Sequence, residues 1–340
     1  MRYFLLFVIS INLFFTPTLT FAQDIEEGVG LKKMVVVGTV PGPDLWKVTD
    51  GENVLWILGT LSPLPKKMKW NSKPVEETIK SSQAFMLPPA FFASLKGIGF
   101  FKKLSLAKSA IGVKKNPEKE KLVDILPEDV YARWLVLKKK YIGNSKKIEK
   151  NRPIFASNKL FSKALKKNGL TEKTGITKKL IKVAKKNDLE IIRPNIEIEL
   201  ADPKAAIKKF KKSEMNDIEC FSKTLDRIET DLTDMAIRAT AWSYGDVRTI
   251  QSLPHTANKG ACDSAFFNSA VGQDLGLAES HARLNQIWIE HAQSSLEKNK
   301  STFAVIPISY LLNEDGILKE LKAAGYEVQE PITLTEMDSP

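Results

Sequence analysis

Hydroxyl and imidazole side chains are the groups in this chain that could perform nucleophilic or acid–base chemistry. Ser62 follows one apolar run, and Ser309 and Tyr310 follow another near the C-terminus. A serine nucleophile needs a base within hydrogen-bond reach. The chain has three histidines: His255, His281 and His291. The sequence therefore allows a hydrolase built on Ser62, Ser309 or Tyr310, although Ser62 lacks the Gly-x-Ser-x-Gly surroundings of a nucleophile elbow.

His281 is the histidine that we consider as a base, because it lies close in sequence to Asn285. His281 and His291 are ten residues apart and point to different faces of a helix predicted over 276–297. A surface histidine without a catalytic part is the alternative. Three His and two Cys provide little material for a His-rich metal centre, and no metal and no cofactor is predicted.

Apolar runs separated by turn residues predict the elements that must position these side chains. Runs at 45–48 and 54–58 flank a Gly-bearing turn and predict a β-hairpin. Further strands are predicted at 84–87, 189–193, 302–306 and 326–328. Helices are predicted at 73–83, 127–141, 154–168, 176–187, 202–213, 216–243, 245–252, 276–297 and 314–324.

Strands near both ends of the chain, with many helices between and around them, predict an α/β (α+β) fold with a central mixed sheet. Residues 45–334 are expected to form this one domain. Ser62 and Ser309 would lie on two loops, 59–65 and 306–313, that meet at the carboxyl edge of the sheet. Folds of this kind place their ligands at such an edge.

The first 22 residues have the pattern of a secretory signal. Arg2 precedes an apolar stretch, and Thr20 and Ala22 are the small residues expected before cleavage after Ala22. The stretch is interrupted by Pro17 and is short for a bilayer span, which needs roughly 20 apolar residues. We expect export to the periplasm or the exterior of a Gram-negative-type cell and no transmembrane segment in the mature chain. Residues 23–44 are expected to form an extended leader with an edge strand over 34–37.

Cys220 and Cys262 are the only cysteines. In an oxidising compartment such a pair can form a disulfide. Closing the long loop between them would stabilise the fold by roughly 3–4 kcal/mol. Two independent buried thiols are the alternative.

Positive charge is concentrated in the segment 91–186, which has 26 Lys and Arg against 7 Asp and Glu. We expect this Lys-rich segment to be helical and to form one basic face. An anionic envelope polymer or lipid head groups would fit such a face. A set of solvated helix faces is the alternative. No aromatic-interleaved motif is present, and nucleic acid is not an expected partner.

Short motifs along nearly the whole chain resemble the TraB/GumN family. They are Leu45-Trp46-Lys47-Val48, the 54–60 strand ending in Gly59-Thr60, Arg152-Pro153-Ile154-Phe155-Ala156, Ala241-Trp242-x-x-Gly245-Asp246, Asn285-x-x-Trp288, Phe303-Ala304-Val305, Asp315-Gly316-Ile317-Leu318 and Gly325-Tyr326-Glu327-Val328. Their order and spacing over residues 45–330 carry the resemblance.

The resemblance implies an erythromycin-esterase-like fold and, in active members such as the Tiki proteases, metal-dependent hydrolysis. Such a site uses a Gly-x-x-His after the first strand, an acidic residue after the following strand and a second His near the C-terminus. These ligands hold an ion whose bound water becomes the nucleophile. This chain has Ser62, Pro88 and Tyr310 at the three positions. Hydroxyls are poor ligands for such an ion and proline is none, so the chain resembles a degenerate member without the metal site.

Three hypotheses follow. The first is an exported TraB/GumN-like binding or scaffolding module, the second a hydrolase with an altered site, and the third a binder of anionic polymer or lipid. The residues that could bind a ligand at the former site are Gly59, Thr60, Ser62, Arg283, Asn285 and Trp288. Core packing is the role that we favour for Trp288, as for Trp46, Trp56 and Trp242, and for Asn285 we favour fixing a loop backbone over reaching the former site.

Overall fold

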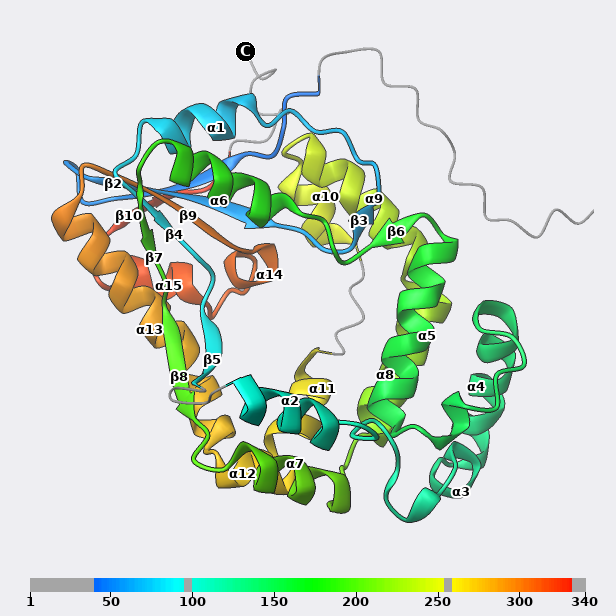
Figure 1. Cartoon of the computed structure of the whole chain (residues 1–340). Coiled ribbons are helices and arrows are strands. Elements are labelled where there is room, and N and C mark those ends of the chain that lie inside the picture. The colour runs from blue at the N-terminus through cyan, green and yellow to red at the C-terminus, as the bar shows by residue number, and fades with distance from the viewer. Residues whose placement is uncertain (1–39, 95–99, 254–258, 332–340) are drawn as a thin grey trace, which may run out of the picture. The chain divides into compact units, whose positions relative to one another are not determined.

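The main β-sheet has six strands in the order β10-β1-β2-β9-β4-β7 (Figure 1). The structure is a computed structural model that describes residues 40–94, 100–253 and 259–331. The predicted signal peptide, its cleavage site and the predicted edge strand over 34–37 lie outside these residues. The strands are β1 (Leu45–Thr49), β2 (Val54–Thr60), β4 (Ala84–Met86), β7 (Glu190–Ile192), β9 (Ser301–Pro307) and β10 (Glu327–Gln329).

The predicted β-hairpin is confirmed, because β1 and β2 pair antiparallel. The carboxylate of Asp50 accepts hydrogen bonds from the backbone N–H groups of Glu52 and Asn53, at 2.9 and 2.7 Å, and so closes the turn. The strands β2, β9, β4 and β7 run parallel, whereas β10 pairs antiparallel with β1. The sheet is thus mixed and is built from both ends of the described chain, as the sequence predicts.

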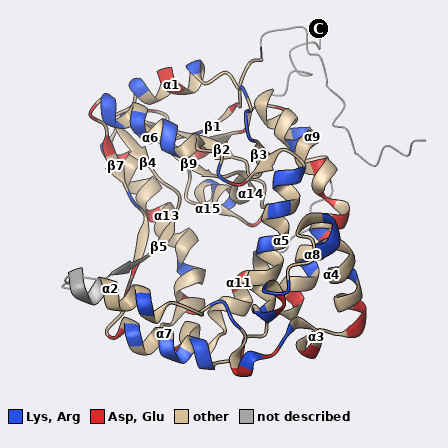
Figure 2. Ribbon diagram, turned by 45° about the vertical axis from the view of Figure 1, so that its right-hand side comes forward, with Lys and Arg blue, Asp and Glu red and all other residues tan. Residues whose placement is uncertain are grey.

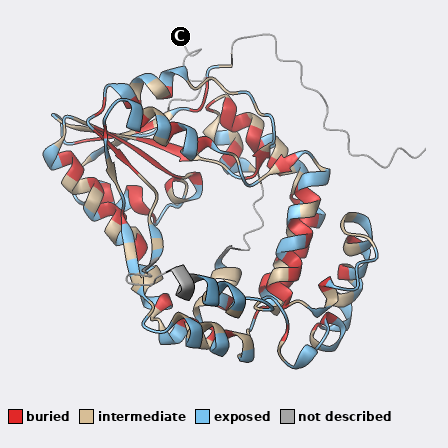
Figure 3. Ribbon diagram, in the orientation of Figure 1, coloured by how far each residue is buried: buried red, intermediate tan, exposed pale blue. Residues whose placement is uncertain are grey.

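Helices cover both faces of this sheet (Figure 1). The helices α1 (Lys73–Lys80) and α6 (Ile176–Lys186) pack together on one face, and α13 (Leu277–Lys298) and α15 (Ile317–Ala323) pack together on the other. The strands β1, β2, β9 and β4 between them are largely buried, whereas the edge strands β7 and β10 are exposed or half-buried (Figure 3). The fold therefore has three layers around the sheet, which is typical of α/β architecture.

A second group of helices has its own apolar core. It comprises α3 (Leu122–Ile125), α4 (Glu128–Tyr141), α5 (Pro153–Lys167) and α8 (Ile218–Thr230). Trp134 of α4 and Phe221 of α8 are fully buried, and their ring centroids are 5.4 Å apart. The predicted helices at 127–141 and 154–168 are confirmed within one residue at each end.

The single helix predicted over 216–243 is wrong. The structure has two helices there, α8 and α9 (Leu232–Ser243), which meet at Asp231. Asp231 is buried and forms an ion pair with Arg238, while Arg227 lies 3.8 Å from it on the other side. The two helices are thus separated at a residue whose carboxylate is buried beside two arginines.

Several short elements were not predicted from the sequence. Two strand pairs stand apart from the main sheet: β3 (Leu64–Pro65) with β6 (Leu170–Thr171), and β5 (Ala90–Ser94) with β8 (Asn195–Glu199). The additional helices are α2 (Phe100–Ser109), α11 (Lys259–Phe267), α12 (Ala270–Asp274) and α14 (Ile308–Leu311). The predicted helices at 202–213 and 245–252 are present as α7 (Pro203–Lys212) and α10 (Val247–Ser252).

The Lys-rich segment is helical, as predicted, but its helices belong to different parts of the fold. α6 packs on β4 and β7, α4 and α5 pack with α8, and α2 packs on α7. Figure 2 shows Lys and Arg on all of these helices. The cations of the segment therefore lie on helices with separate packing partners, and one basic face over the whole segment stays a prediction. Among the described residues, no helix combines the length and the apolar composition needed to cross a membrane.

Candidate functional site at the carboxyl edge of the sheet

The carboxyl ends of β2, β9 and β4 lie at the same edge of the sheet. In the register of the strands, Ala304 is the partner of both Ile57 and Met86, and Thr60 is opposite Pro307. Ser62, Tyr310 and Pro88 each follow the end of one of these three neighbouring parallel strands. The topology thus brings the three positions of the implied metal site to one edge.

Ser62 is exposed, and its Oγ donates a 3.4 Å hydrogen bond to the carbonyl oxygen of Glu172. Thr60 is half-buried and donates a 3.2 Å hydrogen bond to the carbonyl oxygen of Ile306 on β9. The hydroxyl of Ser62 therefore bonds to the chain beyond β6, and the hydroxyl of Thr60 reinforces the pairing of the two central strands.

Ser309 and Tyr310 do not lie on a loop, so the loop expected over 306–313 is wrong. They belong to α14, a one-turn helix that begins directly after β9. Ile308 and Leu311 of this helix are buried in the main core, and that burial favours a helical turn over an open loop. Ser309 is exposed, whereas Tyr310 is half-buried and packs against the core.

The residues at this edge do not fit a divalent metal ion of the hydrolytic kind. Such an ion takes imidazole or carboxylate ligands. Ser62 and Tyr310 provide neutral hydroxyls, and Pro88 provides no side-chain donor. In the described ranges, no group of three or more His, Cys, Asp and Glu side chains is arranged to hold a metal ion.

Gly59 has a clear structural role at this edge. A Cβ at this position would lie 2.9 Å from Cγ1 of Ile308 and 3.0 Å from Cζ3 of Trp46. The carbonyl oxygen of Gly59 accepts a 2.7 Å hydrogen bond from the indole Nε1 of Trp242, which is itself buried. Packing and hydrogen bonding at the end of β2 thus account for the glycine.

Asp44 is a residue that the sequence analysis did not single out. It precedes β1 and packs against Gly245, where an added Cβ would lie 2.5 Å from Oδ2 of Asp44. Gly245 also has a φ of +73°, which favours glycine. The chain packed around the Asp44 carboxyl shields it from water, and this desolvation raises its pKa above its ordinary value of 3.8.

Asp44 and Gly245 line a small cavity. Trp46, Trp242 and Ile308 line it as well, and its volume is about 10 Å³, which is room for about one water molecule. The cavity is too small for a substrate. The residues around it instead hold the start of β1 against the turn between α9 and α10.

His281 lies in an aromatic cluster. Its ring centroid is 4.6 Å from that of Phe267 on α11 and 6.5 Å from that of Phe91 on β5. Its Nε2 is 3.8 Å from a carboxylate oxygen of Asp263. The structure therefore places His281, the base considered above, beside an Asp and two Phe residues. The hydrogen bond described for the hydroxyl of Ser62 goes to the carbonyl oxygen of Glu172 and not to this histidine.

The three remaining candidate binding residues lie on α13 and differ in exposure. Arg283 is exposed, Asn285 is half-buried, and Trp288 is fully buried in the main core. The Nε1 of Trp288 has no hydrogen-bond partner among the described residues. Trp46 and Trp242 are also buried, whereas Trp56 is only half-buried, and its indole ring lies 6.0 Å from Nζ of Lys47.

The Arg152-Pro153 motif opens α5 and joins distant segments. The guanidinium of Arg152 is almost fully buried and donates to the carbonyl oxygens of Lys115, at 3.2 Å, and of Phe210, at 2.6 Å. Asp217 accepts a 2.8 Å hydrogen bond from the backbone N–H of Ile154 in the first turn of α5. Burial raises the pKa of Asp217 and lowers that of Arg152. These are structural roles that the sequence analysis missed.

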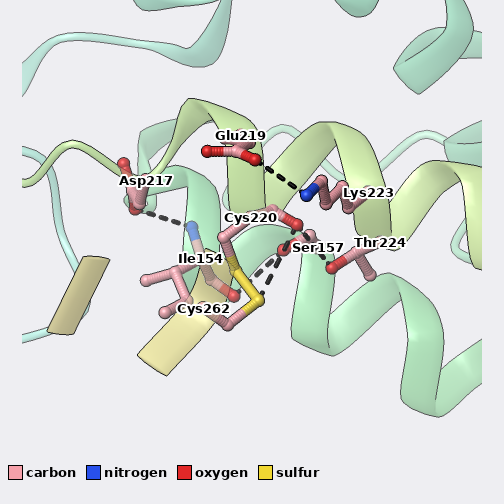
Figure 4. The surroundings of a disulfide bond; sticks show 8 residues. All are labelled: Ile154, Ser157, Asp217, Glu219, Cys220, Lys223, Thr224 and Cys262. Atoms are coloured by element: carbon pink, nitrogen blue, oxygen red, sulfur yellow. Dashed lines mark hydrogen bonds and ion pairs between the residues drawn. A yellow bond between two sulfur atoms is a disulfide. The ribbon is translucent and has the colours of Figure 1, made fainter. Parts of the chain in front are cut away.

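Cys220 and Cys262 form a disulfide beside this motif (Figure 4). Their Cα atoms are 4.6 Å apart and join α8 to α11. Cys220 is fully buried, and its carbonyl oxygen accepts a 2.7 Å hydrogen bond from the hydroxyl of Thr224. The predicted pairing of the two cysteines is therefore confirmed, and two independent thiols are excluded.

The fold is of the α/β class, with a mixed β-sheet between two layers of helices. The Gly59–Trp242 hydrogen bond joins two of the motifs that resemble the TraB/GumN family. Residues 44–330 match the TraB/PrgY/gumN family. The match covers most of the chain, and the chain belongs to this family. No curated protein and no solved structure matches it.

Proposed function

We propose that this chain is an exported TraB/PrgY/gumN-family protein that acts in the cell envelope as a binding or scaffolding module and not as a metal-dependent hydrolase. One observation carries the proposal. The edge where β2, β4 and β9 end has Ser62, Pro88 and Tyr310 at the positions where a metal-dependent relative would need imidazole and carboxylate groups.

Two neutral hydroxyls and a proline supply no charge to compensate a divalent ion. Metal binding by side chains needs deprotonated or neutral-imidazole ligands, and affinity falls steeply when these are absent. Meanwhile the packing that shapes the edge is intact, since Gly59, Ile308 and Trp242 remain in close contact. The fold at this edge is therefore intact, while the three side chains that would bind a metal ion are replaced. This combination supports a binding role rather than metal-dependent chemistry.

Export is supported by the disulfide between Cys220 and Cys262. Disulfides persist in oxidising compartments and are rare in the cytosol. The signal-peptide pattern of residues 1–22 points in the same direction. N-terminal sequencing of the protein recovered outside the cytoplasm should give Gln23 as the first residue, and a chain that retains Met1 there would contradict the proposal.

Calorimetric titration with zinc, manganese and cobalt tests the metal part of the proposal. We expect no stoichiometric binding by the wild-type protein. A triple variant, Ser62→His/Pro88→Glu/Tyr310→His, serves as the positive control because it restores the ligand types at the same edge. Stoichiometric metal in the wild type that is lost in Ser62→Ala or Tyr310→Phe would overturn the proposal and favour an altered hydrolase.

A further inference from the structure

The helices α2 and α7 pack against each other and carry a high density of positive charge. Residues 100–115 contain five Lys and no Asp or Glu, and residues 203–212 likewise contain five Lys and no Asp or Glu. Figure 2 shows Lys residues in blue on α7 and on the described part of α2. Lys209 is paired with Asp274 of α12.

Large apolar side chains are exposed within the same region. Ile111, in the turn after α2, is 73% exposed, and Leu104 of α2 is 50% exposed. The backbone N–H of Ile111 donates a 3.2 Å hydrogen bond to the carbonyl oxygen of Lys108, which places both residues in one turn. We call the exposed residues of this region the α2–α7 surface: Leu104, Lys108, Ile111, Lys114, Lys208 and Lys212.

A buried arginine holds the two parts of this surface together. Arg152 donates to the carbonyl oxygen of Lys115, after α2, and to that of Phe210 on α7. Its guanidinium also lies 4.7 Å above the ring of Phe210. Arg152 therefore links the segment after α2 to α7, and segments that are linked in this way lose less conformational entropy on binding.

We propose that the α2–α7 surface binds the anionic phospholipid surface of a membrane. Lysines around exposed aliphatic side chains are the combination that binds such an interface, because the lysines attract anionic head groups while the aliphatic groups enter the acyl boundary. A hydrated anionic polysaccharide would also attract the lysines, but it offers no apolar phase for Ile111 and Leu104. The two exposed aliphatic residues therefore favour lipid.

The surface of α9 provides a control within the same chain. Ile237 of α9 is 43% exposed, so it is comparable to Leu104. Its surroundings differ in charge, because α9 has Asp234 in its first turn and no Lys or Arg in its last turn, and Arg238 is paired with Asp231. An exposed aliphatic residue in this setting lacks the electrostatic attraction that the α2–α7 surface provides.

The test is cosedimentation of the purified full-length protein with phospholipid vesicles. Wild-type protein should bind vesicles of phosphatidylcholine that contain phosphatidylglycerol, and it should bind pure phosphatidylcholine much less. Ile111→Ser should weaken binding by about 10- to 30-fold. Lys208→Gln and Lys212→Gln should each weaken it by about fivefold. Ile237→Ser should leave it unchanged, and circular dichroism should show the same fold for every variant.

Two results would overturn the proposal. The first is no difference between Ile111→Ser and the wild type on the anionic vesicles. The second is binding to soluble dextran sulfate without any binding to vesicles. If that binding depended on Lys208 but not on Ile111, the surface would be assigned to an anionic polymer. The proposal rests on the proposed envelope location and binding role. Vesicle binding and metal titration address different surfaces, so each proposal can fail without the other.

Discussion

The indole Nε1 of Trp242 donates a 2.7 Å hydrogen bond to the carbonyl oxygen of Gly59, a residue 183 positions earlier in the chain. The bond joins the last turn of α9 to the end of β2. Trp242 is 2% exposed and also packs against Trp70, with ring centroids 5.4 Å apart. Two motifs that are far apart in the sequence are thus one structural unit at the carboxyl edge of the sheet.

Replacing Trp242 with Phe should destabilise the protein by about 1–3 kcal/mol, because the buried carbonyl of Gly59 would lose its partner. The free energy of unfolding from urea denaturation measures the effect. Trp56→Phe is the control, since Trp56 is half-buried, and we expect it to cost about 1 kcal/mol or less. Equal losses in the two variants would show that the hydrogen bond contributes little.

Gly59→Ala should cost about 1–3 kcal/mol, because its Cβ would lie 2.9 Å from Cγ1 of Ile308. The double variant Gly59→Ala/Ile308→Ala should be more stable than the sum of the two single changes predicts, because the shortened side chain leaves room for the new methyl group. Urea denaturation of the four proteins gives the coupling energy. If the losses of unfolding free energy in the two single variants simply add up in the double variant, the contact with Ile308 is not the cause of the destabilisation by Gly59→Ala.

Removing the disulfide in Cys220→Ser/Cys262→Ser should destabilise the protein by about 4 kcal/mol, since the two cysteines are 42 residues apart and the cross-link restricts the unfolded chain. A reductant should lower the unfolding free energy of the wild type towards that of the double variant. The double variant itself should not respond to the reductant. A response of similar size in both proteins would contradict this account.

Glu76 should make the stability of the protein depend on pH. A hydrogen bond from Lys179, at 2.8 Å, and one from Ser72, at 2.7 Å, lower the pKa of Glu76 below its ordinary value of 4.5. The stabilisation is therefore present above pH 4.5 and is lost as the pH falls through the lowered pKa in the folded state. We expect Glu76→Gln to cost about 0.5–1 kcal/mol at pH 7 and progressively less in acid.

The control for this prediction is Glu77→Gln, which removes the exposed pair with Lys80. It should change the unfolding free energy little at any pH. Urea denaturation at several pH values between 3 and 7 measures both variants. A Glu76→Gln effect that stays constant over this range would rule out the titration of Glu76 as its source.

Elements specified by local sequence signals were predicted well. The hairpin was found because its two apolar runs flank Asp50-Gly51-Glu52-Asn53, whose side chains close the turn. Helices with a strong apolar stripe, such as α5 and α6, were placed within one residue at each end. The β5–β8 pair was missed because its strands are about a hundred residues apart and short runs of this kind carry no local signal for their partner.

The candidate site was predictable in its topology but not in its contacts. The resemblance placed Ser62, Pro88 and Tyr310 after three strands, and in the structure these strands end at the same edge of the sheet. The helix at 308–311 was missed because its formation depends on the burial of Ile308 and Leu311 against the sheet. The contact between Asp44 and Gly245 joins residues about two hundred positions apart, and a single sequence gives no means of pairing them.

The place of β9 in the sheet sets a condition on when the protein can fold. This strand lies between β2 and β4, and Thr60 bonds to Ile306 across 246 positions of the chain. A ribosome must therefore complete nearly the whole polypeptide before the two early strands can acquire the neighbour that joins them. Folding dominated by such distant pairings is intrinsically slow, so the nascent chain remains open for longer than one whose sheet forms from consecutive strands. An unfolded chain can pass through a narrow protein-conducting channel. This chain therefore keeps that ability until its last segments have been synthesised.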